Sequence, residues 1–160
     1  MTKKLLFVCL GNICRSPAAE GIMNHLIEQA SLKSQITCDS AGTSNYHIGE
    51  PPDQRMVQAA RQREILLQGS GRQFQLEDFA DFDLILAMDQ ENYHTLLFLD
   101  RAGRYHDKIR LICEFCTHHS DQEVPDPYYG GALGFQYVID LLLDACEGLL
   151  RHLTQVETVS

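Results

Sequence analysis

The sequence contains no long apolar run and few basic residues, and each shortage argues against a class of protein. No apolar stretch approaches the length that crosses a bilayer, so a membrane-spanning protein is not expected. Only 13 lysines and arginines stand against 22 acidic residues, which gives a formal net charge of −9. An acidic surface disfavours nucleic acid as a partner. An anionic substrate would have to be attracted by a local group of donors, because the overall field repels it.

Repeats, low-complexity tracts and linker-like segments are also absent. The sequence therefore predicts one domain, residues 1–160, with 155–160 as a frayed tail. Residues 1–9 imitate a secretory signal, but their apolar stretch is too short and no small-residue cleavage site follows. We therefore expect a first strand there, a cytoplasmic protein acting as a monomer, and six reduced cysteines in place of a disulfide framework.

Short apolar runs alternate with segments of helical periodicity, which is typical of a doubly wound α/β domain. The sequence predicts a four-stranded parallel twisted sheet with helices on both faces. Asp53 and Asp89 stand where N-caps of the second and third helices are expected. The predicted strands are 4–9, 35–39, 83–87 and 108–113, and the predicted helices are 17–31, 54–64, 90–99 and 133–152.

The segment that joins the first strand to the first helix carries most of the functional information. It reads Cys9-Leu10-Gly11-Asn12-Ile13-Cys14-Arg15-Ser16, and Ser16-Pro17 is interpreted as the N-cap and first position of the helix. Backbone N–H groups of such a loop can surround a tetrahedral oxyanion, aided by the helix N-terminus. Arg15 can close the ring with a planar fork, and the same field favours the thiolate at Cys9. The loop would bind phosphate and activate a nucleophile; the alternative is an inert buried Cys9 and an ordinary surface Arg15.

Asp126 is the candidate general acid for cleavage of a phosphate ester. It lies between Pro125 and Pro127, which remove two backbone donors and stiffen the segment. A neighbouring phosphate dianion favours the protonated carboxyl group, which could then protonate the leaving oxygen. The alternative is a loop carboxylate that initiates a turn.

Four blocks of the chain resemble the low-molecular-weight protein tyrosine phosphatases. They are VCLGNICRSP at 8–17, DSAGT at 39–43, FDLILAMD at 82–89 and DPYYG at 126–130. The resemblance covers nearly the whole chain and implies a four-stranded parallel sheet with the phosphate-binding loop after the first strand. It implies hydrolysis through a cysteinyl-phosphate without a metal or another cofactor. The expected substrates are phosphotyrosine-containing proteins or small aryl phosphates.

The resemblance also implies a role for each matching residue. Cys9 would be the nucleophile, Arg15 the phosphate clamp and Asp126 first the acid and then the base. Ser16 would donate to the Cys9 thiolate, and Leu10 to Cys14 would supply the rest of the loop.

Other matching positions would support the loop or receive the substrate. Asn12, bonded to Ser40, would hold the loop in a left-handed turn. Tyr128 and Tyr129, with Tyr46 on the facing loop, would form the walls around a phosphotyrosine ring.

One departure from the family pattern concerns the support of the loop. Many members carry a histidine before the third strand, linked to the Asn–Ser pair, but residues 68–72 here read QGSGR. Ser70 is the expected substitute.

Two groups of cysteines leave alternatives open. Cys14 either fills the loop interior or, as the resemblance favours, pairs with oxidised Cys9 and protects it from irreversible oxidation. Cys113 and Cys116, followed by His118-His119, resemble part of a zinc ligand set, but a second well-spaced pair is missing. The alternative there is that Cys113 ends the fourth strand and the rest is loop.

Three other functions compete with tyrosine phosphatase. An arsenate reductase would need relay cysteines, and 73–100 contains none, so only Cys113 and Cys116 keep that option open. A non-catalytic phosphate binder would not need Asp126. Phosphoarginine or a small phosphoester could replace phosphotyrosine, although Ile13 and the tyrosines suit a flat aromatic ring.

Overall fold

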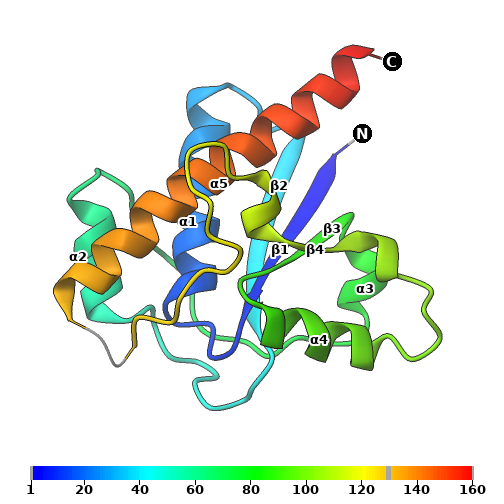
Figure 1. Cartoon of the computed structure of the whole chain (residues 1–160), viewed down its shortest axis with the longest axis horizontal. Coiled ribbons are helices and arrows are strands. Elements are labelled where there is room, and N and C mark those ends of the chain that lie inside the picture. The colour runs from blue at the N-terminus through cyan, green and yellow to red at the C-terminus, as the bar shows by residue number, and fades with distance from the viewer. Residues whose placement is uncertain (1, 129–130, 160) are drawn as a thin grey trace.

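The computed structural model describes residues 2–128 and 131–159, and its framework is a four-stranded parallel sheet in the order β2-β1-β3-β4 (Figure 1). The crossover order places β1 and β3 at the centre of the sheet. The strands are β1 (Lys3–Cys9), β2 (Ile36–Gly42), β3 (Leu84–Ala87) and β4 (Ile109–Leu111). The helices are α1 (Arg15–Gln29), α2 (Gln54–Arg61), α3 (Asp78–Asp81), α4 (Gln90–Leu99) and α5 (Ala132–Val159), with 3-10 turns η1 (His106–Lys108) and η2 (Ile112–Phe115).

Alternation along β1 distributes its side chains to two hydrophobic clusters, one on each face of the sheet. Leu5, Phe7 and Cys9 belong to the larger cluster. Leu6 and Val8 belong to the smaller one. Both faces of a central parallel strand are buried, which explains why β1 reads as a continuous apolar run.

Helices cover both faces, as the sequence predicts. In Figure 1, α1, α2 and α5 lie on one side of the sheet, and α3 and α4 lie on the other. Helix α5 packs on α1, α2 and η2. Gly148 makes the last contact possible, because a Cβ atom there would lie 1.8 Å from the carbonyl oxygen of Phe115.

The predicted fold class is confirmed, while several element boundaries differ from the prediction. Strand β2 extends from 36 to 42 because it pairs with β1 along its full length, up to the pair Cys9–Gly42. Strand β4 ends at Leu111, and Cys113 lies in the 3-10 turn η2, so the prediction that Cys113 ends the strand was wrong. Helix α2 ends at Arg61, before Glu64 adopts a φ of 61°.

The long C-terminal helix continues to Val159, beyond the predicted end at 152. Whether residues 155–160 fray in solution stays a prediction. Among the helices of the described residues, none combines the length and apolar character needed to cross a membrane.

Candidate active site

The loop after β1 is shaped by neighbours that take up its carbonyl groups. Thr43 N–H donates to the Cys9 carbonyl oxygen at 2.9 Å, Ser44 N–H to that of Leu10 at 3.0 Å, and Asp53 N–H to that of Ile13 at 2.8 Å. These carbonyls point away from the loop centre. Because C=O and N–H point in opposite directions across a trans peptide, the N–H groups of the same peptides turn inward. The loop is therefore lined with donors, as an anion site requires.

Two residues allow the loop to curl this tightly. Asn12 has a φ of 60°, the left-handed region that asparagine tolerates better than most residues. Gly42, at the end of β2, lies so close that a Cβ atom there would be 2.8 Å from the Leu10 carbonyl oxygen. The DSAGT block thus has glycine at position 42 because the loop packs directly on the strand backbone.

The thiol of Cys9 is buried and surrounded by hydrogen-bond donors. Its exposed fraction is 2%, and its Sγ lies 3.0 Å from Ser16 Oγ and accepts the Asn12 N–H at 3.2 Å. The N-terminus of α1 begins at the end of the same loop, so the partial positive charge of the helix lies nearby. The sulfur therefore lies close to a backbone N–H group, a hydroxyl group and the N-terminus of a helix.

The prediction that Ser16 caps α1 was wrong. The N-cap is Cys14, without a side-chain cap bond, and Arg15 is the first helical residue. The Ser16 hydroxyl contacts Cys9 and accepts from Asn12 at 2.8 Å. Pro17 still lies in the first turn, where its missing N–H costs no helical hydrogen bond.

The Arg15 guanidinium is 3% exposed and is held by three groups. Its Nη1 donates to Asp89 Oδ2 at 2.6 Å and to the Val124 carbonyl oxygen at 3.1 Å, while Nη2 lies 3.6 Å from Asp126 Oδ2. Burial alone would lower the pKa of Arg15, but the sulfur of Cys9 and these two carboxylates outweigh it and raise the pKa. The guanidinium is therefore a fixed positive charge beside the loop.

Asp126 lies at the opening of the site, with its side chain 42% exposed. Its Oδ1 accepts the Tyr128 N–H at 3.0 Å, which orients the carboxyl group within its own turn. Its Oδ2 faces Arg15. The structure thus brings Asp126, from a distant part of the sequence, to the loop that carries Cys9 and Arg15.

These residues line a cavity of about 140 Å³ beneath an aromatic rim. Tyr128 and Tyr46 are part of its lining, and Tyr46 is 74% exposed. Tyr129 lies outside the described residues. Sequence reasoning missed His47, whose ring lies 6.0 Å from that of Tyr128 and whose Nδ1 lies 2.6 Å from Glu50 Oε2. The sequence signal that could have identified His47 as a lining residue was its position next to Tyr46. The other lining residues are Cys9, Leu10, Gly11, Ile13, Cys14, Arg15 and Asp126.

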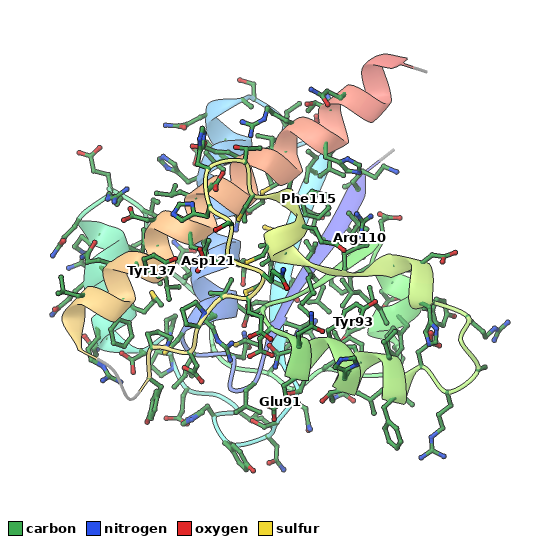
Figure 2. All side chains as sticks on the ribbon, in the orientation of Figure 1. Glu91, Tyr93, Arg110, Phe115, Asp121 and Tyr137 are labelled. Carbon is green, nitrogen blue, oxygen red and sulfur yellow. The ribbon has the colours of Figure 1, made fainter. Side chains whose placement is uncertain are left out.

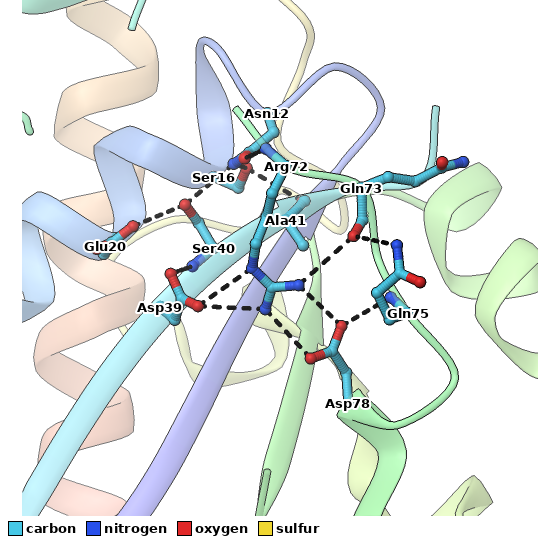
Figure 3. A network of polar contacts seen from close by, with 10 residues as sticks. All are labelled: Asn12, Ser16, Glu20, Asp39, Ser40, Ala41, Arg72, Gln73, Gln75 and Asp78. Carbon is cyan, nitrogen blue, oxygen red and sulfur yellow. Dashed lines mark hydrogen bonds and ion pairs between the residues drawn. The ribbon is translucent and has the colours of Figure 1, made fainter. Parts of the chain in front are cut away.

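A second polar network supports the loop from behind and replaces the absent histidine (Figure 3). Asn12 Nδ2 donates to Ser40 Oγ at 3.0 Å, as the resemblance implied, and Asn12 Oδ1 accepts the Arg72 N–H at 2.9 Å. The Arg72 side chain bonds Asp39 and Asp78, which fixes the segment that carries this N–H. The backbone of Arg72 therefore makes the contact expected from Ser70, which instead lines a small cavity beside Asn12.

Hydrogen bonds connect the segment between η2 and Asp126 to α5. Asp144 accepts the N–H groups of Thr117, His118 and His119 at 2.9 Å each. Burial alone would raise the pKa of Asp144, but these hydrogen bonds hold it far below its usual value. Tyr137 donates to Asp121 Oδ2 at 2.6 Å, and the two side chains face each other in Figure 2.

The remaining thiols are free, including all those suggested for redox or metal roles. Burial raises the pKa of Cys14 to about 12, that of Cys113 to about 12 and that of Cys116 to about 11. Within the described ranges, no three histidine, cysteine or acidic side chains gather as a metal site. His119 instead contacts Asp144 through Nδ1 at 2.8 Å.

The model of one protein family matches almost the whole chain. The family is described as low molecular weight phosphotyrosine protein phosphatase, and the match covers residues 4–158. The chain belongs to this family.

Individual relatives agree with the family assignment. A Synechocystis sp. protein assigned by name to the low molecular weight protein-tyrosine-phosphatases is 61% identical over 150 residues, covering 94% of this chain and 96% of its own length. A protein tyrosine phosphatase from Entamoeba histolytica, crystallised with Hepes in the active site, is 48% identical with a TM-score of 0.93, covering 98% and 99%. A Drosophila arginine phosphatase is 35% identical with a TM-score of 0.87, covering 93% and 96%. The enzyme class predicted from the four blocks is thus confirmed.

Proposed function

We propose that this phosphatase hydrolyses phosphotyrosine and other aryl phosphate monoesters through a phosphocysteine at Cys9, without a metal ion. The observation that carries the proposal is the convergence of a donor-lined loop, a buried guanidinium and a carboxyl group on one cavity. The loop N–H groups and Arg15 would bind three phosphate oxygens. The Cys9 sulfur would then lie behind the phosphorus, opposite the leaving oxygen.

In the first step the Cys9 thiolate forms the S–P bond while the P–O bond to the aryl group breaks. Asp126, protonated beside the phosphate dianion, gives its proton to the leaving oxygen. A bound dianion would also attract Arg15 Nη2, which lies 3.6 Å from Asp126 Oδ2, to its own oxygens. The carboxyl group would then be released to face the leaving group.

In the second step water attacks the phosphocysteine. The Asp126 carboxylate takes a proton from water as the P–O bond forms, and the electron pair of the S–P bond returns to Cys9. The donors around the sulfur, Ser16 Oγ at 3.0 Å and Asn12 N–H at 3.2 Å, would stabilise the departing thiolate.

Cys14 would protect the nucleophile from over-oxidation. Peroxide would convert the Cys9 thiolate to a sulfenic acid, releasing hydroxide, and the Cys14 thiol would displace water to form a disulfide. Cys9 and Cys14 lie in the same loop and line the same cavity. Burial raises the pKa of Cys14 to about 12, so this thiol does not compete with Cys9 as the nucleophile.

The aromatic rim favours an aryl ester as the substrate. Tyr46 and Tyr128 would flank a phenyl ring, and Ile13 offers an apolar floor. The physiological substrates would be phosphotyrosine-containing proteins. The enzyme would act on them as a monomer in the cytoplasm, with neither nucleic acid nor a membrane as a partner. Because one structural relative is described as an arginine phosphatase, phosphoarginine is the second candidate substrate.

A substrate panel in the presence of a chelator tests the proposal. We expect hydrolysis of nitrophenyl phosphate and of phosphotyrosine peptides at rates that EDTA does not change. Phosphoserine peptides and phosphoarginine should be much poorer substrates. Loss of activity with EDTA would contradict the metal-free mechanism, and a preference for phosphoarginine would replace the proposed substrate class.

A further inference from the structure

A chain of hydrogen bonds leads from Cys9 through the back of the loop to the carboxyl group of Glu20 on α1, and Figure 3 shows its part from Ser16 to Glu20. Cys9 Sγ contacts Ser16 Oγ at 3.0 Å, and Asn12 Nδ2 lies 2.8 Å from Ser16 Oγ and 3.0 Å from Ser40 Oγ. Ser40 Oγ lies 2.6 Å from Glu20 Oε1. Glu20 is half-buried and lines the small cavity of about 130 Å³ beside Asn12.

The direction of each hydrogen bond in this chain is determined by Arg72. Its backbone N–H can only donate, and it donates to Asn12 Oδ1 at 2.9 Å. The amide group of Asn12 must therefore present its NH2 to the two serine hydroxyls. Each hydroxyl oxygen accepts from Asn12, so each hydroxyl proton must be directed to a different partner.

The two hydroxyl protons have well-defined acceptors. The proton of Ser40 goes to the Glu20 carboxylate, and the distance of 2.6 Å is that of a charge-assisted bond. The proton of Ser16 can reach the Cys9 sulfur at 3.0 Å or the Ala41 carbonyl oxygen at 3.5 Å, and the sulfur is nearer. The chain is therefore directional, with a hydrogen-bond acceptor at each end, the Glu20 carboxyl group and the Cys9 sulfur.

Asn12 connects the two ends. It orients the Ser16 hydroxyl that donates to Cys9, and its own backbone N–H also donates to that sulfur. Without an acceptor at position 20, the hydroxyl of Ser40, which is 7% exposed, would be left with an unsatisfied proton. Ser40 would then turn, and Asn12 would lose an anchor in its left-handed conformation.

We propose that Glu20 is a positioning residue that holds Asn12 and Ser16 in the orientation that stabilises the Cys9 thiolate. The inference rests on the proposed phosphocysteine mechanism. Its main effect falls on the second step, where the S–P bond breaks and its electron pair returns to sulfur. An acceptor at position 20 is what the chain requires, so glutamine should preserve the function and an apolar residue of similar length should not.

Three variants on α1 test the assignment by rapid mixing with nitrophenyl phosphate. Glu20→Met should lower kcat roughly three- to ten-fold, the effect of about one hydrogen bond, with a smaller change in kcat/KM. Because breakdown of the phosphocysteine becomes slower, the initial burst of nitrophenol should grow relative to wild type. Glu20→Gln should restore kcat to within about two-fold, since its amide oxygen can accept from Ser40. Glu28→Met, an exposed position on the same helix, is the matched control and should match wild type.

A purely structural role for Glu20 predicts a different pattern. In that case Glu20→Met would lower the fraction of active enzyme, so kcat and kcat/KM would fall by the same factor and the burst would shrink. This result would overturn the inference. It would also be overturned if Glu20→Met matched Glu28→Met. Should Glu20→Met fail to fold, Ser40→Ala must show the enlarged burst, since it removes the same hydrogen bond from its other side. A wild-type enzyme without a burst or activity would instead contradict the proposed function itself.

Discussion

Replacing Asp89 with asparagine separates two tasks that this side chain performs. Its Oδ2 accepts from Arg15 Nη1 at 2.6 Å, and its Oδ1 caps α4 by accepting the Asn92 N–H at 2.8 Å. Asparagine is as good an N-cap as aspartate, so the cap should survive. The charged partner of the buried guanidinium would be lost, and with it the fixed direction of the fork.

The expected loss follows from the strength of that contact. A hydrogen bond between charged groups contributes about 1.5–3 kcal/mol, and every 1.4 kcal/mol is about a factor of ten. We therefore expect Asp89→Asn to lower kcat/KM for nitrophenyl phosphate by roughly 10- to 100-fold and to weaken inhibition by inorganic phosphate similarly. Stability should fall less, because the cap remains and Asp126 and the Val124 carbonyl still contact Arg15.

Asp89→Ala is the comparison that makes the test decisive. It should show the same loss of kcat/KM but an additional loss of about 1 kcal/mol in unfolding free energy, because the cap is removed as well. Urea unfolding and steady-state kinetics measure the two effects. A kcat/KM and phosphate inhibition constant for Asp89→Asn equal to wild type would refute the idea that Asp89 orients Arg15.

Three further predictions concern the general acid Asp126, the redox partner Cys14 and Asp144 on α5. Asp126→Ala should lower kcat/KM by about two to four orders of magnitude for esters with poor leaving groups and much less for activated ones, whereas equal losses across a series of aryl phosphates would remove Asp126 from the acid role. After peroxide treatment, wild-type activity should return with dithiothreitol, while Cys14→Ser should remain partly inactive; full recovery of the variant would show that Cys14 does not protect Cys9. Asp144 has a lowered pKa in the folded state, so its contribution is present above the ordinary aspartate pKa and disappears as the pH falls. Asp144→Asn should therefore cost about 2–4 kcal/mol of unfolding free energy at neutral pH and progressively less below about pH 4, as chemical denaturation can measure; a loss independent of pH would contradict the assignment.

Local signals explain why the sequence predicted the first strand, the loop after it and the first helix. The strand, the loop and the helix from Lys3 to Gln29 are contiguous, and their apolar pattern and loop composition agree with one another. The N-caps Asp53 and Asp89 were predicted correctly for the same reason, since each accepts a backbone N–H in the first turn of its helix. Ser16 was misplaced because a residue that can cap a helix can equally bind a neighbouring sulfur.

Features that depend on tertiary contacts could not be predicted in this way. The pairing of Arg15 with Asp89 and the Val124 carbonyl joins three separate segments. The contact of Arg72 with Asn12 uses a backbone N–H, for which side-chain identity gives no signal. The sequence likewise predicted a strand over 108–113, whereas β4 spans only Ile109–Leu111. The length of β4 depends on its pairing with β3, a tertiary contact.

The most direct test of the account is to trap the covalent intermediate. The enzyme is mixed with a phosphotyrosine peptide, quenched in acid within the burst phase, digested and analysed by mass spectrometry. We predict a phosphoryl group on the peptide that contains Cys9 and none on the same peptide from Cys9→Ser. Rapid turnover with no phosphorylated Cys9 at any quench time, or activity retained in Cys9→Ser, would contradict it.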